Sequence, residues 1–315
     1  MNIVFLDAGT LGADMDLSAF RAMGSVTVYD RTGPNALAAR LCGAEIAVIN
    51  KVRLTAAVLA EAPTLRLICI TATGFDNVDL DCCRERGIAV CNVVGYSTRC
   101  VAQVTVTMAL SLITHLREYT DHVRSGAYTN GKSPNCLTPV YHEIAGKTWG
   151  VVGYGNIGRQ VAHVAEALGC RVLVCKRTPV SGVACADMET VCREADILSL
   201  HIPLNASTRN LLSRERISLL RPDAVVINVA RGAVADEAAL AEAVREGRIG
   251  GLGVDVYSAE PLPADHPYQS VRHLPNVCLT PHMAWGGYET RVRLLEEIRL
   301  NMEAFARGER RCRVD

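Results

Sequence analysis

The sequence predicts an α/β fold with two doubly wound parallel sheets, and three observations support this prediction. Short apolar runs typical of buried strands alternate with helical segments along the whole chain, an order that favours parallel sheets covered by helices on both faces. A Gly-rich turn at residues 153–158 lies between two such strands. About 150 residues precede that turn, which is enough for a separate domain.

The first half of the chain contains its own series of strands. Segments 17–23 and 55–61 are rich in Ala and Leu, and we predict them as helices between strands. Because the two kinds of segment alternate, we expect a parallel sheet distinct from the one that includes the Gly-rich turn. The predicted buried strands are 2–6, 26–29, 46–49, 67–70 and 88–91.

Residues 153–158 have the G-x-G-x-x-G spacing of a dinucleotide-binding turn. They follow the apolar run 148–152 and open an amphipathic helical pattern over 159–168, and the strand 171–175 completes a βαβ unit. Three glycines at this spacing also occur in ordinary loops. The βαβ context nevertheless favours a Rossmann-like domain that binds a dinucleotide.

Each glycine of the turn has a physical role in that interpretation. Gly153 permits the tight turn, Gly155 lets the backbone approach a pyrophosphate, and Gly158 lets the helix and the strand pack closely. The N–H groups at the start of the helix, together with the positive end of its dipole, would then bind the phosphates.

The remaining elements suggest how the two domains are connected. A long helical pattern from Arg99 to about Ser125 predicts a helix that leads from the first domain into the second. Segment 126–136 is predicted as an exposed loop from its Asn, Gly, Ser and Pro content. Further strands are predicted at 196–200, 224–229, 251–256 and 277–280, and a last helix at about 288–307.

We therefore expect the Rossmann-like cofactor domain to be inserted in the sequence of the other domain. Residues 1–98 and 288–315 would form a flavodoxin-like substrate domain, and residues 99–287 would form the dinucleotide-binding domain. The helical patterns on both sides of the Gly-rich half can each cross between domains.

The hydrophobic content of the chain is sufficient for two cores, and the composition argues against several classes of function. The chain has 315 residues, 49% hydrophobic, and a formal net charge of zero, so there is no electrostatic basis for binding nucleic acid or an acidic membrane. No apolar run approaches the length of a membrane span, and the N-terminus lacks the basic and apolar regions of a signal peptide.

Thirteen cysteines are many for this length, but the number is odd and no two form a C-x-x-C pair. Cys69, Cys91, Cys170 and Cys175 lie in or beside apolar strand patterns, where a thiol behaves as a small hydrophobic group. We expect neither a metal site nor disulfides. Free thiols in a chain without an export signal indicate the reducing cytoplasm.

Three polar residues lie just beyond the ends of predicted strands in the second half. Arg231, Glu260 and His282 each follow one of the last three strands. Ligands of open α/β sheets bind at the carboxyl ends of strands, so all three residues can face one crevice. Singly, such an Arg is usually a surface charge and such a His is usually structural. Together they provide a guanidinium for a carboxylate, and a His with a carboxylate that can orient it.

Ordered motifs along essentially the whole chain resemble those of the D-isomer-specific 2-hydroxyacid dehydrogenases. Several ordered matches of this kind make the resemblance specific. Besides the Gly-rich turn, the motifs are 71–79 (TATGFDNVD), 196–204 (DILSLHIPL), 228–232 (NVARG), 255–261 (DVYSAEP) and 280–282 (TPH).

The resemblance implies an enzyme, a nicotinamide cofactor and a catalytic set. In that family the Arg, Glu and His at these places are catalytic, which carries over to Arg231, Glu260 and His282. The chemistry suits a 2-oxo acid: His282 as imidazolium can donate a proton to the ketone oxygen, and Glu260 can fix the ring. Arg231 can bind the substrate carboxylate and polarise the carbonyl with a fork that lysine lacks. No metal is needed.

Further contacts are implied by the resemblance. Backbone amides of Thr73 and Gly74 would hold the substrate carboxylate, and Asp255 would contact the nicotinamide carboxamide. Lys51 lies in a segment similar to glycerate dehydrogenases and is a candidate substrate contact, with a solvated loop lysine as the alternative. The candidate cofactor-binding residues are Gly153, Tyr154, Gly155, Asn156, Ile157, Gly158, Lys176, Arg177, Thr178, His201, Pro203, Thr208, Ala230 and Asp255.

The identity of the cofactor depends on the end of the second strand of the βαβ unit. An NAD enzyme usually places Asp or Glu there, about 20 residues beyond the Gly motif, on the ribose hydroxyls. Here the sequence is Cys175-Lys176-Arg177-Thr178, with two cations that can pair with a 2′-phosphate. This favours NADP. A simple charged turn is the alternative, and NAD then remains open.

Within the family, the sequence is similar to glycerate dehydrogenases, also called hydroxypyruvate reductases. Segments 95–98 (GYST) and 281–285 (PHMAW), together with Gln103, support that subgroup, whereas Glu260 argues against formate dehydrogenases, which pair their His with Gln. Trp285 either lines the substrate pocket or anchors a domain interface. We expect reduction of a small 2-oxo acid, hydroxypyruvate or glyoxylate, to D-glycerate or glycolate.

Two alternatives to that function stay open. One is a D-2-hydroxyacid dehydrogenase for a bulkier 2-oxo acid, because the sequence does not define the size of the pocket. The other is a non-catalytic NAD(P)-gated binding protein of the co-repressor type, although the tails and nuclear signals of such proteins are missing here. We also expect a homodimer, because relatives dimerise through the region after Arg99, which is rich here in apolar and aromatic residues: Met108, Tyr119, Tyr128 and Tyr141.

Overall fold

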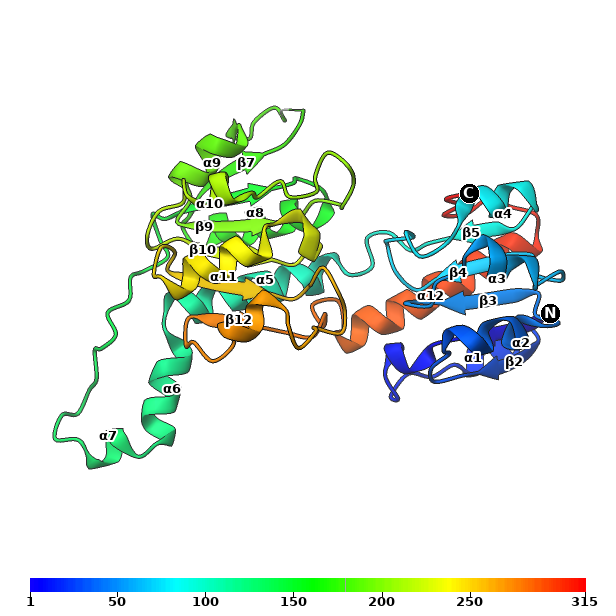
Figure 1. Cartoon of the computed structure of the whole chain (residues 1–315), viewed down its shortest axis with the longest axis horizontal. Coiled ribbons are helices and arrows are strands. Elements are labelled where there is room, and N and C mark those ends of the chain that lie inside the picture. The colour runs from blue at the N-terminus through cyan, green and yellow to red at the C-terminus, as the bar shows by residue number, and fades with distance from the viewer. Residues whose placement is uncertain (179) are drawn as a thin grey trace. The chain divides into compact units, whose positions relative to one another are not determined.

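The computed structural model describes residues 1–178 and 180–315, and the chain divides into two compact units. The first unit comprises Met1–Ser97 and Gly286–Asp315, and the second comprises Thr98–Trp285 (Figure 1). Each unit has its own parallel sheet. The predicted fold class, two parallel-sheet α/β domains with one inserted in the sequence of the other, is confirmed.

The first unit contains a five-stranded sheet in the order β2-β1-β3-β4-β5, with every neighbouring pair parallel. This is the flavodoxin-like order, in which the strand order reverses at β1 because β1 pairs with both β2 and β3. The strands are β1 (Asn2–Phe5), β2 (Ser25–Val28), β3 (Ile46–Ile49), β4 (Leu67–Ile70) and β5 (Ala89–Cys91).

One strand of this sheet differs from its prediction. The run at 26–29 was predicted as a buried strand, but most side chains of β2 are exposed. The reason is its place at the edge of the sheet, where it pairs with β1 alone. Its Val-rich sequence reflects β-propensity rather than burial.

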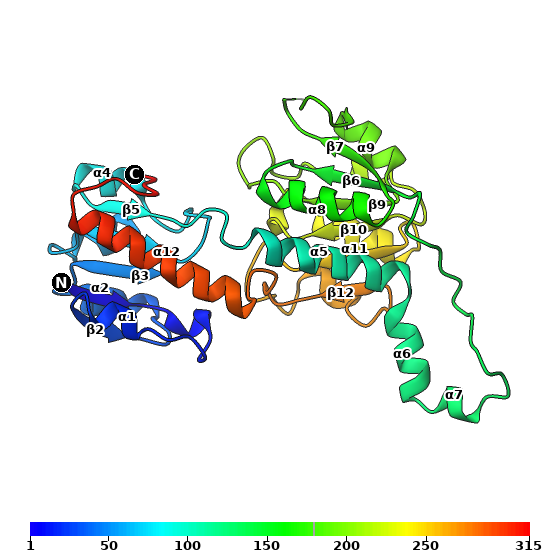
Figure 2. The ribbon, with the colours of Figure 1, turned by 180° about the vertical axis from the view of Figure 1, so that it is seen from behind.

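Helices cover both faces of the first sheet. Leu41 of α2, Leu59 of α3 and Cys83 of α4 are fully buried against one face, and α12 packs on β4 and lies along the other face (Figure 2). Side chains cap two short helices: Thr55 accepts a hydrogen bond from the N–H of Val58, and Asp79 from that of Cys82. The helical segments are η1 (Ala8–Leu11), α1 (Ser18–Arg21), η2 (Pro34–Ala36), α2 (Leu37–Leu41), α3 (Ala56–Ala60), α4 (Leu80–Glu85) and α12 (Tyr288–Ala306).

The second unit contains a seven-stranded parallel sheet in the order β12-β11-β10-β9-β6-β7-β8. The order reverses at β6, which pairs with β7 and with β9. The two-residue strand β8 was not predicted because it is too short to show a pattern. The strands are β6 (Thr148–Val152), β7 (Arg171–Cys175), β8 (Cys185–Ala186), β9 (Ile197–Leu200), β10 (Val225–Asn228), β11 (Gly251–Val254) and β12 (Val277–Leu279).

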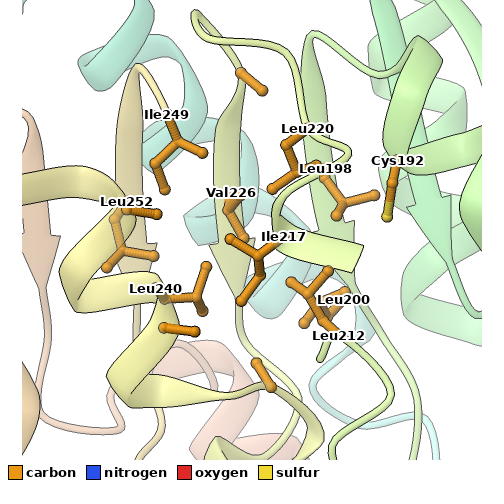
Figure 3. Packing of buried hydrophobic residues seen from close by; sticks show 14 of the residues in the cluster. Cys192, Leu198, Leu200, Leu212, Ile217, Leu220, Val226, Leu240, Ile249 and Leu252 are labelled. Atoms are coloured by element: carbon orange, nitrogen blue, oxygen red, sulfur yellow. The ribbon is translucent and has the colours of Figure 1, made fainter. Parts of the chain in front are cut away.

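Both faces of the seven-stranded sheet carry a hydrophobic core. On one face Leu198, Leu200 and Val226 of the sheet pack with Ile217 of α10 and Leu240 of α11 (Figure 3). On the other face α5 and α8 cover the sheet (Figure 2). The helices are α5 (Thr98–Ile113), α6 (Leu116–Arg124), α7 (Ala127–Asn130), α8 (Asn156–Ala167), α9 (Met188–Glu194), α10 (Arg214–Ile217), η3 (Gly232–Val234), α11 (Glu237–Arg245) and η4 (Pro267–Ser270).

The long helix predicted from Arg99 is two helices. The chain bends by 65° between α5 and α6, where His115 adopts a left-handed conformation with φ of 51°. The apolar periodicity continues across the bend, so the sequence does not show it. The one-turn helix α7 lies within the segment predicted as a loop, 126–136. In the described residues no single helix is long and apolar enough to cross a membrane, and the bent pair α5–α6 meets that test by length and composition alone.

Candidate active site

The turn after β10 carries Arg231 and is fixed by a buried amide. The side chain of Asn228 is fully buried; its Nδ2 donates to the carbonyl oxygen of Arg231 (3.0 Å) and its Oδ1 accepts from the N–H of Ala230 (3.1 Å). A Cβ atom on Gly232 would overlap the backbone of Tyr257. Only a glycine therefore lets this turn pack directly on the loop after β11, which carries Glu260.

Glu260 and His282 are in direct contact. Oε2 of Glu260 lies 2.7 Å from Nδ1 of His282, and both side chains are partly exposed. Oε1 of Glu260 accepts from the N–H of Tyr257 (3.2 Å), which fixes the carboxylate. Because an ionised carboxylate can only accept, Nδ1 carries the proton of this hydrogen bond. Nε2 is the ring nitrogen that Glu260 does not hold.

His282 has an uncommon backbone conformation, which Asp255 supports. The φ of His282 is 54°, in the left-handed region that few non-glycine residues adopt. The buried carboxylate of Asp255 accepts from Thr280 Oγ1 (2.6 Å) and from the N–H groups of Met283 (2.8 Å) and Ala284 (2.9 Å). These three bonds use most of the roughly four acceptor positions of a carboxylate. Asp255 thus holds the loop around His282, a contact that the sequence motif does not reveal.

A second His–Glu pair behind the first was missed by sequence reasoning. Nε2 of His266 lies 3.1 Å from Oε2 of Glu237, and the two side chains are only 4% and 10% exposed. Nδ1 of His266 accepts from the N–H of Tyr268 (3.2 Å), so the ring donates to Glu237 through Nε2. Glu237 also accepts from the N–H of Ser258 (3.0 Å). The pair fixes the start of the loop that carries Glu260, and no motif or spacing marks it.

The Gly-rich turn after β6 fits a dinucleotide. Gly153 has φ of 93°, where a side chain would be strained, and a Cβ on Gly158 would overlap the carbonyl of Gly153. The fold therefore requires both glycines. Gly155 is different: a Cβ there would meet nothing within 4 Å, and the residue caps the N-terminus of α8. A glycine that the fold does not need, at the start of a helix, leaves room for a phosphate to approach the backbone.

His201 follows β9, the neighbour of β6, and has an orphaned atom. Ser199 Oγ accepts from Trp149 Nε1 (2.9 Å) and lies 2.9 Å from His201 Nε2. With the serine hydroxyl donating to Nε2, the proton of the neutral ring lies on Nδ1, which is buried and has no partner among the described residues. Burial lowers the pKa of His201 to about 3. A neutral ring with an unsatisfied donor fits a polar ligand at this strand end.

The remaining cofactor candidates lie at other strand ends of the same sheet. Lys176, Arg177 and Thr178 directly follow β7, with Arg177 exposed and Lys176 half-buried. Thr208 Oγ1 donates to the carbonyl of Pro203 (2.6 Å) and closes the loop after β9. Ala230 is buried in the turn after β10. All lie on the carboxyl side of the sheet, where ligands of such folds bind.

The candidate substrate residues Lys51, Thr73 and Gly74 lie in the first unit, in the loops after β3 and β4. Thr73 is anchored at both ends, since its Oγ1 donates to the carbonyl of Val93 (2.8 Å) and its own carbonyl accepts from Asn92 Nδ2 (2.7 Å). The side chain of Lys51 is exposed, and the residues on either side of it are buried.

Several known proteins are similar to this chain in sequence or in fold. Residues 106–284 match the family model described as D-isomer specific 2-hydroxyacid dehydrogenase, NAD binding domain. A glycerate dehydrogenase of Methylorubrum extorquens is 37% identical over 97% of this chain and 96% of its own length. A hydroxypyruvate reductase of Blautia hydrogenotrophica is 30% identical over 98% of both chains.

A solved structure agrees over the full length. An acyclic imino acid reductase in complex with NADPH and D-Arg is 27% identical, with a TM-score of 0.88 and coverage of 100% of both chains. The family match spans more than half of this chain, and the sequence relatives cover nearly all of it. The chain therefore belongs to the D-isomer-specific 2-hydroxyacid dehydrogenases, oxidoreductases that use a nicotinamide cofactor.

Proposed function

We propose that the protein reduces hydroxypyruvate to D-glycerate or glyoxylate to glycolate, with NADPH preferred to NADH. The proposal rests on the contact of 2.7 Å between His282 Nδ1 and Glu260 Oε2. These residues follow β12 and β11, and β11 is the neighbour of β10, the strand that leads into the turn with Arg231. The relatives named glycerate dehydrogenase and hydroxypyruvate reductase support the substrate, because glycerate is reduced hydroxypyruvate.

The proposed proton donor is Nε2 of His282. A bound nicotinamide would supply the hydride that reduces the ketone carbon. Negative charge builds on the ketone oxygen in that step, and a positioned acid lowers the barrier by donating a proton. Since Glu260 holds Nδ1, the ring would give up the proton on Nε2, and the carboxylate would compensate the positive charge that the ring carries before the transfer.

Arg231 would bind the anionic end of the substrate. A guanidinium offers parallel donors that match a carboxylate or polarise a carbonyl oxygen, a geometry that an ammonium lacks. Its turn is fixed by Asn228, which reduces the entropy lost on binding. In the first unit the backbone N–H groups of Thr73 and Gly74 are the proposed contacts for the carboxylate, in a loop anchored at Asn92.

The preference for NADPH rests on the two cations after β7. Lys176 and Arg177 have no acidic partner among the residues that the structure describes, so their charges can pair with a 2′-phosphate. A protein of the same fold has been solved with NADPH. The segment has no carboxylate for the ribose hydroxyls that NAD presents.

We also propose a cytoplasmic homodimer. None of the thirteen cysteines, all of which lie in the described part of the chain, forms a disulfide, and this suits a reducing compartment. The segment formed by α6, α7 and residues 131–145 extends away from the seven-stranded sheet (Figure 1) and exposes apolar side chains, with Leu137 at 71% and Val140 at 72%. A second copy of the chain would cover them.

Steady-state kinetics with a panel of 2-oxo acids, each with NADPH and with NADH, test the function. We expect the highest kcat/KM with hydroxypyruvate or glyoxylate and NADPH. A larger kcat/KM for a branched or aromatic 2-oxo acid would replace the proposed substrate with a bulkier one. Tight NADPH binding without turnover of any 2-oxo acid would instead indicate a nucleotide-gated binding protein.

A further inference from the structure

The first unit has a buried carboxylate at the point where its strand order reverses. Asp7 follows β1, and the loop Asn50–Val52 follows its neighbour β3. The carboxylate of Asp7 accepts from three successive backbone N–H groups, those of Asn50 (2.9 Å), Lys51 (2.6 Å) and Val52 (3.0 Å). Successive N–H groups that converge in this way form an anion site, and the chain fills this one with its own side chain.

The opposite side of the same loop is held as well. Nδ2 of Asn77 donates to the carbonyl of Asn50 (3.0 Å) and to that of Val52 (2.8 Å). Asn77 belongs to the loop after β4, which also carries Thr73 and Gly74. The amide of Asn77 therefore helps to join the two loops that hold the candidate substrate contacts of this unit.

The hydrogen bonds of Asp7 and Asn77 to the loop Asn50–Val52 determine which side chain of that loop reaches solvent. Asn50 and Val52 are buried, whereas Lys51 between them is exposed. Burial raises the pKa of Asp7, and the three N–H groups and the charge of Lys51 oppose that rise. The carboxylate offers enough acceptor positions for all three N–H groups, which an uncharged amide oxygen would not. Its negative charge is also favourable to the cation of Lys51.

We propose that Asp7 is a positioning residue for substrate binding, which fixes the loop Asn50–Val52 so that the Lys51 ammonium attracts the anionic 2-oxo acid. This inference rests on the proposed function, because it takes a 2-oxo acid as the substrate. Crevices at such reversal points are where ligands of open α/β sheets bind. An ammonium held there by a fixed backbone loses less entropy on binding a carboxylate than a mobile surface lysine does.

A double-mutant cycle tests the inference with hydroxypyruvate and NADPH. Lys51→Ala should raise KM roughly tenfold, the size expected for loss of one charged contact, with kcat little changed. Asp7→Asn keeps the shape of the side chain but removes its charge and one acceptor, and should raise KM by a similar factor. If Asp7 acts through Lys51, the double variant should be no worse than Lys51→Ala alone.

Asp315→Asn is the matched control. Asp315 also accepts a backbone N–H, that of Val90 (2.8 Å), in the same sheet, so a general loosening of this unit would affect it equally. Its KM should equal that of the wild type, and the NADPH dissociation constant should be the same in all variants. A wild-type KM for Asp7→Asn, or additive effects in the double variant, would overturn the inference.

Two further results are informative. If Asp7→Asn does not fold, Asn77→Ala takes its place, because it releases the carbonyl side of the loop. Asn77→Ala should raise KM in the wild-type protein but cause no further rise in the Lys51→Ala variant. An additive rise in KM would overturn the positioning role. Failure of the proposed function would look different, because the wild-type protein itself would then reduce no 2-oxo acid.

Discussion

At the scale of single residues, the His282–Glu260 contact predicts how activity depends on pH. Reduction needs His282 protonated and oxidation needs it neutral, because the ring donates the proton in one direction and accepts it in the other. Reduction should therefore decline as pH rises, while oxidation improves. Glu260→Gln keeps an acceptor at the 2.7 Å contact but removes its negative charge, so the declining limb of kcat/KM for reduction should shift to lower pH.

A variant of His282 itself is the control for this experiment. His282→Gln should lose most turnover and still bind NADPH nearly as the wild type does, as measured by nucleotide fluorescence. His201 cannot produce the same profile, because its pKa near 3 leaves it neutral between about pH 5 and 9. A His282→Gln protein with wild-type reductase rates would require another proton donor.

The cofactor preference is a second prediction about residues. Neutralising Lys176 and Arg177 together should erode a preference for NADPH of roughly tenfold to a few hundredfold, because charged contacts to a half-exposed phosphate contribute a few kcal/mol at most. The ratio of kcat/KM for NADPH and NADH is the measurement. Arg193→Ala, which removes an exposed cation of α9 in the same unit, should leave the ratio unchanged. Equal use of NADH by the wild type would contradict the assignment.

The candidate side chains at strand ends could be predicted from the sequence, but the hydrogen bonds that hold their loops in place could not. Arg231, Glu260 and His282 were found because each follows an apolar strand. Asp255 binds the loop around His282 from 28 positions away, and Asp7 binds the loop at Lys51 from 44 positions away. Such contacts depend on the register between loops of different strands, which no local pattern encodes.

At the scale of elements, the parallel strands were the most predictable feature. Runs such as 46–49 and 67–70 are buried on both faces, so their apolar sequence coincides with β3 and β4. The edge strands were less predictable: β2 is exposed where burial was expected, and β8 is too short to detect. The bend after α5 is likewise absent from the periodicity, because it results from the left-handed His115.

The Gly-rich turn predicts that the change from glycine to alanine has different effects at two positions, one on stability and the other on cofactor binding. Gly158→Ala should destabilise the fold, because its Cβ would overlap the Gly153 carbonyl. Gly155→Ala should leave the melting temperature close to that of the wild type, since its Cβ would meet no protein atom within 4 Å. It should nevertheless weaken NADPH binding by roughly tenfold or more, because the methyl group occupies the approach to the pyrophosphate. Thermal melts and nucleotide titrations separate the two effects.

The comparison of the two glycines also tests the identity of the ligand site. If Gly155→Ala bound NADPH as tightly as the wild type, the pyrophosphate would not approach this backbone, and the dinucleotide would have to bind elsewhere. A large loss of stability in Gly155→Ala would show instead that the glycine serves the fold.

At the scale of the whole molecule, the exposed apolar segment after α5 predicts the state of assembly. Within that segment, Tyr119 of α6 donates to the carbonyl of Pro139 (2.5 Å) and its ring stacks edge-on to Tyr141, so α6 and the chain beyond α7 hold each other. An ordered projection with Leu137 and Val140 more than two-thirds exposed is costly for a monomer. Light scattering at micromolar concentration should therefore give twice the chain mass of 34.0 kDa.

Charge placed on that surface should prevent the assembly without unfolding the chain. The double variant Leu137→Glu with Val140→Glu changes two side chains that already lie in solvent, so each unit should keep its core. The mass should fall to that of one chain, because two copies cannot bury four carboxylates. Val28→Glu places one such charge on an exposed apolar residue of β2 and should leave the dimer intact. A wild-type protein that is already monomeric would remove the need for a partner surface, and a double variant that stays dimeric would place the interface elsewhere on the molecule.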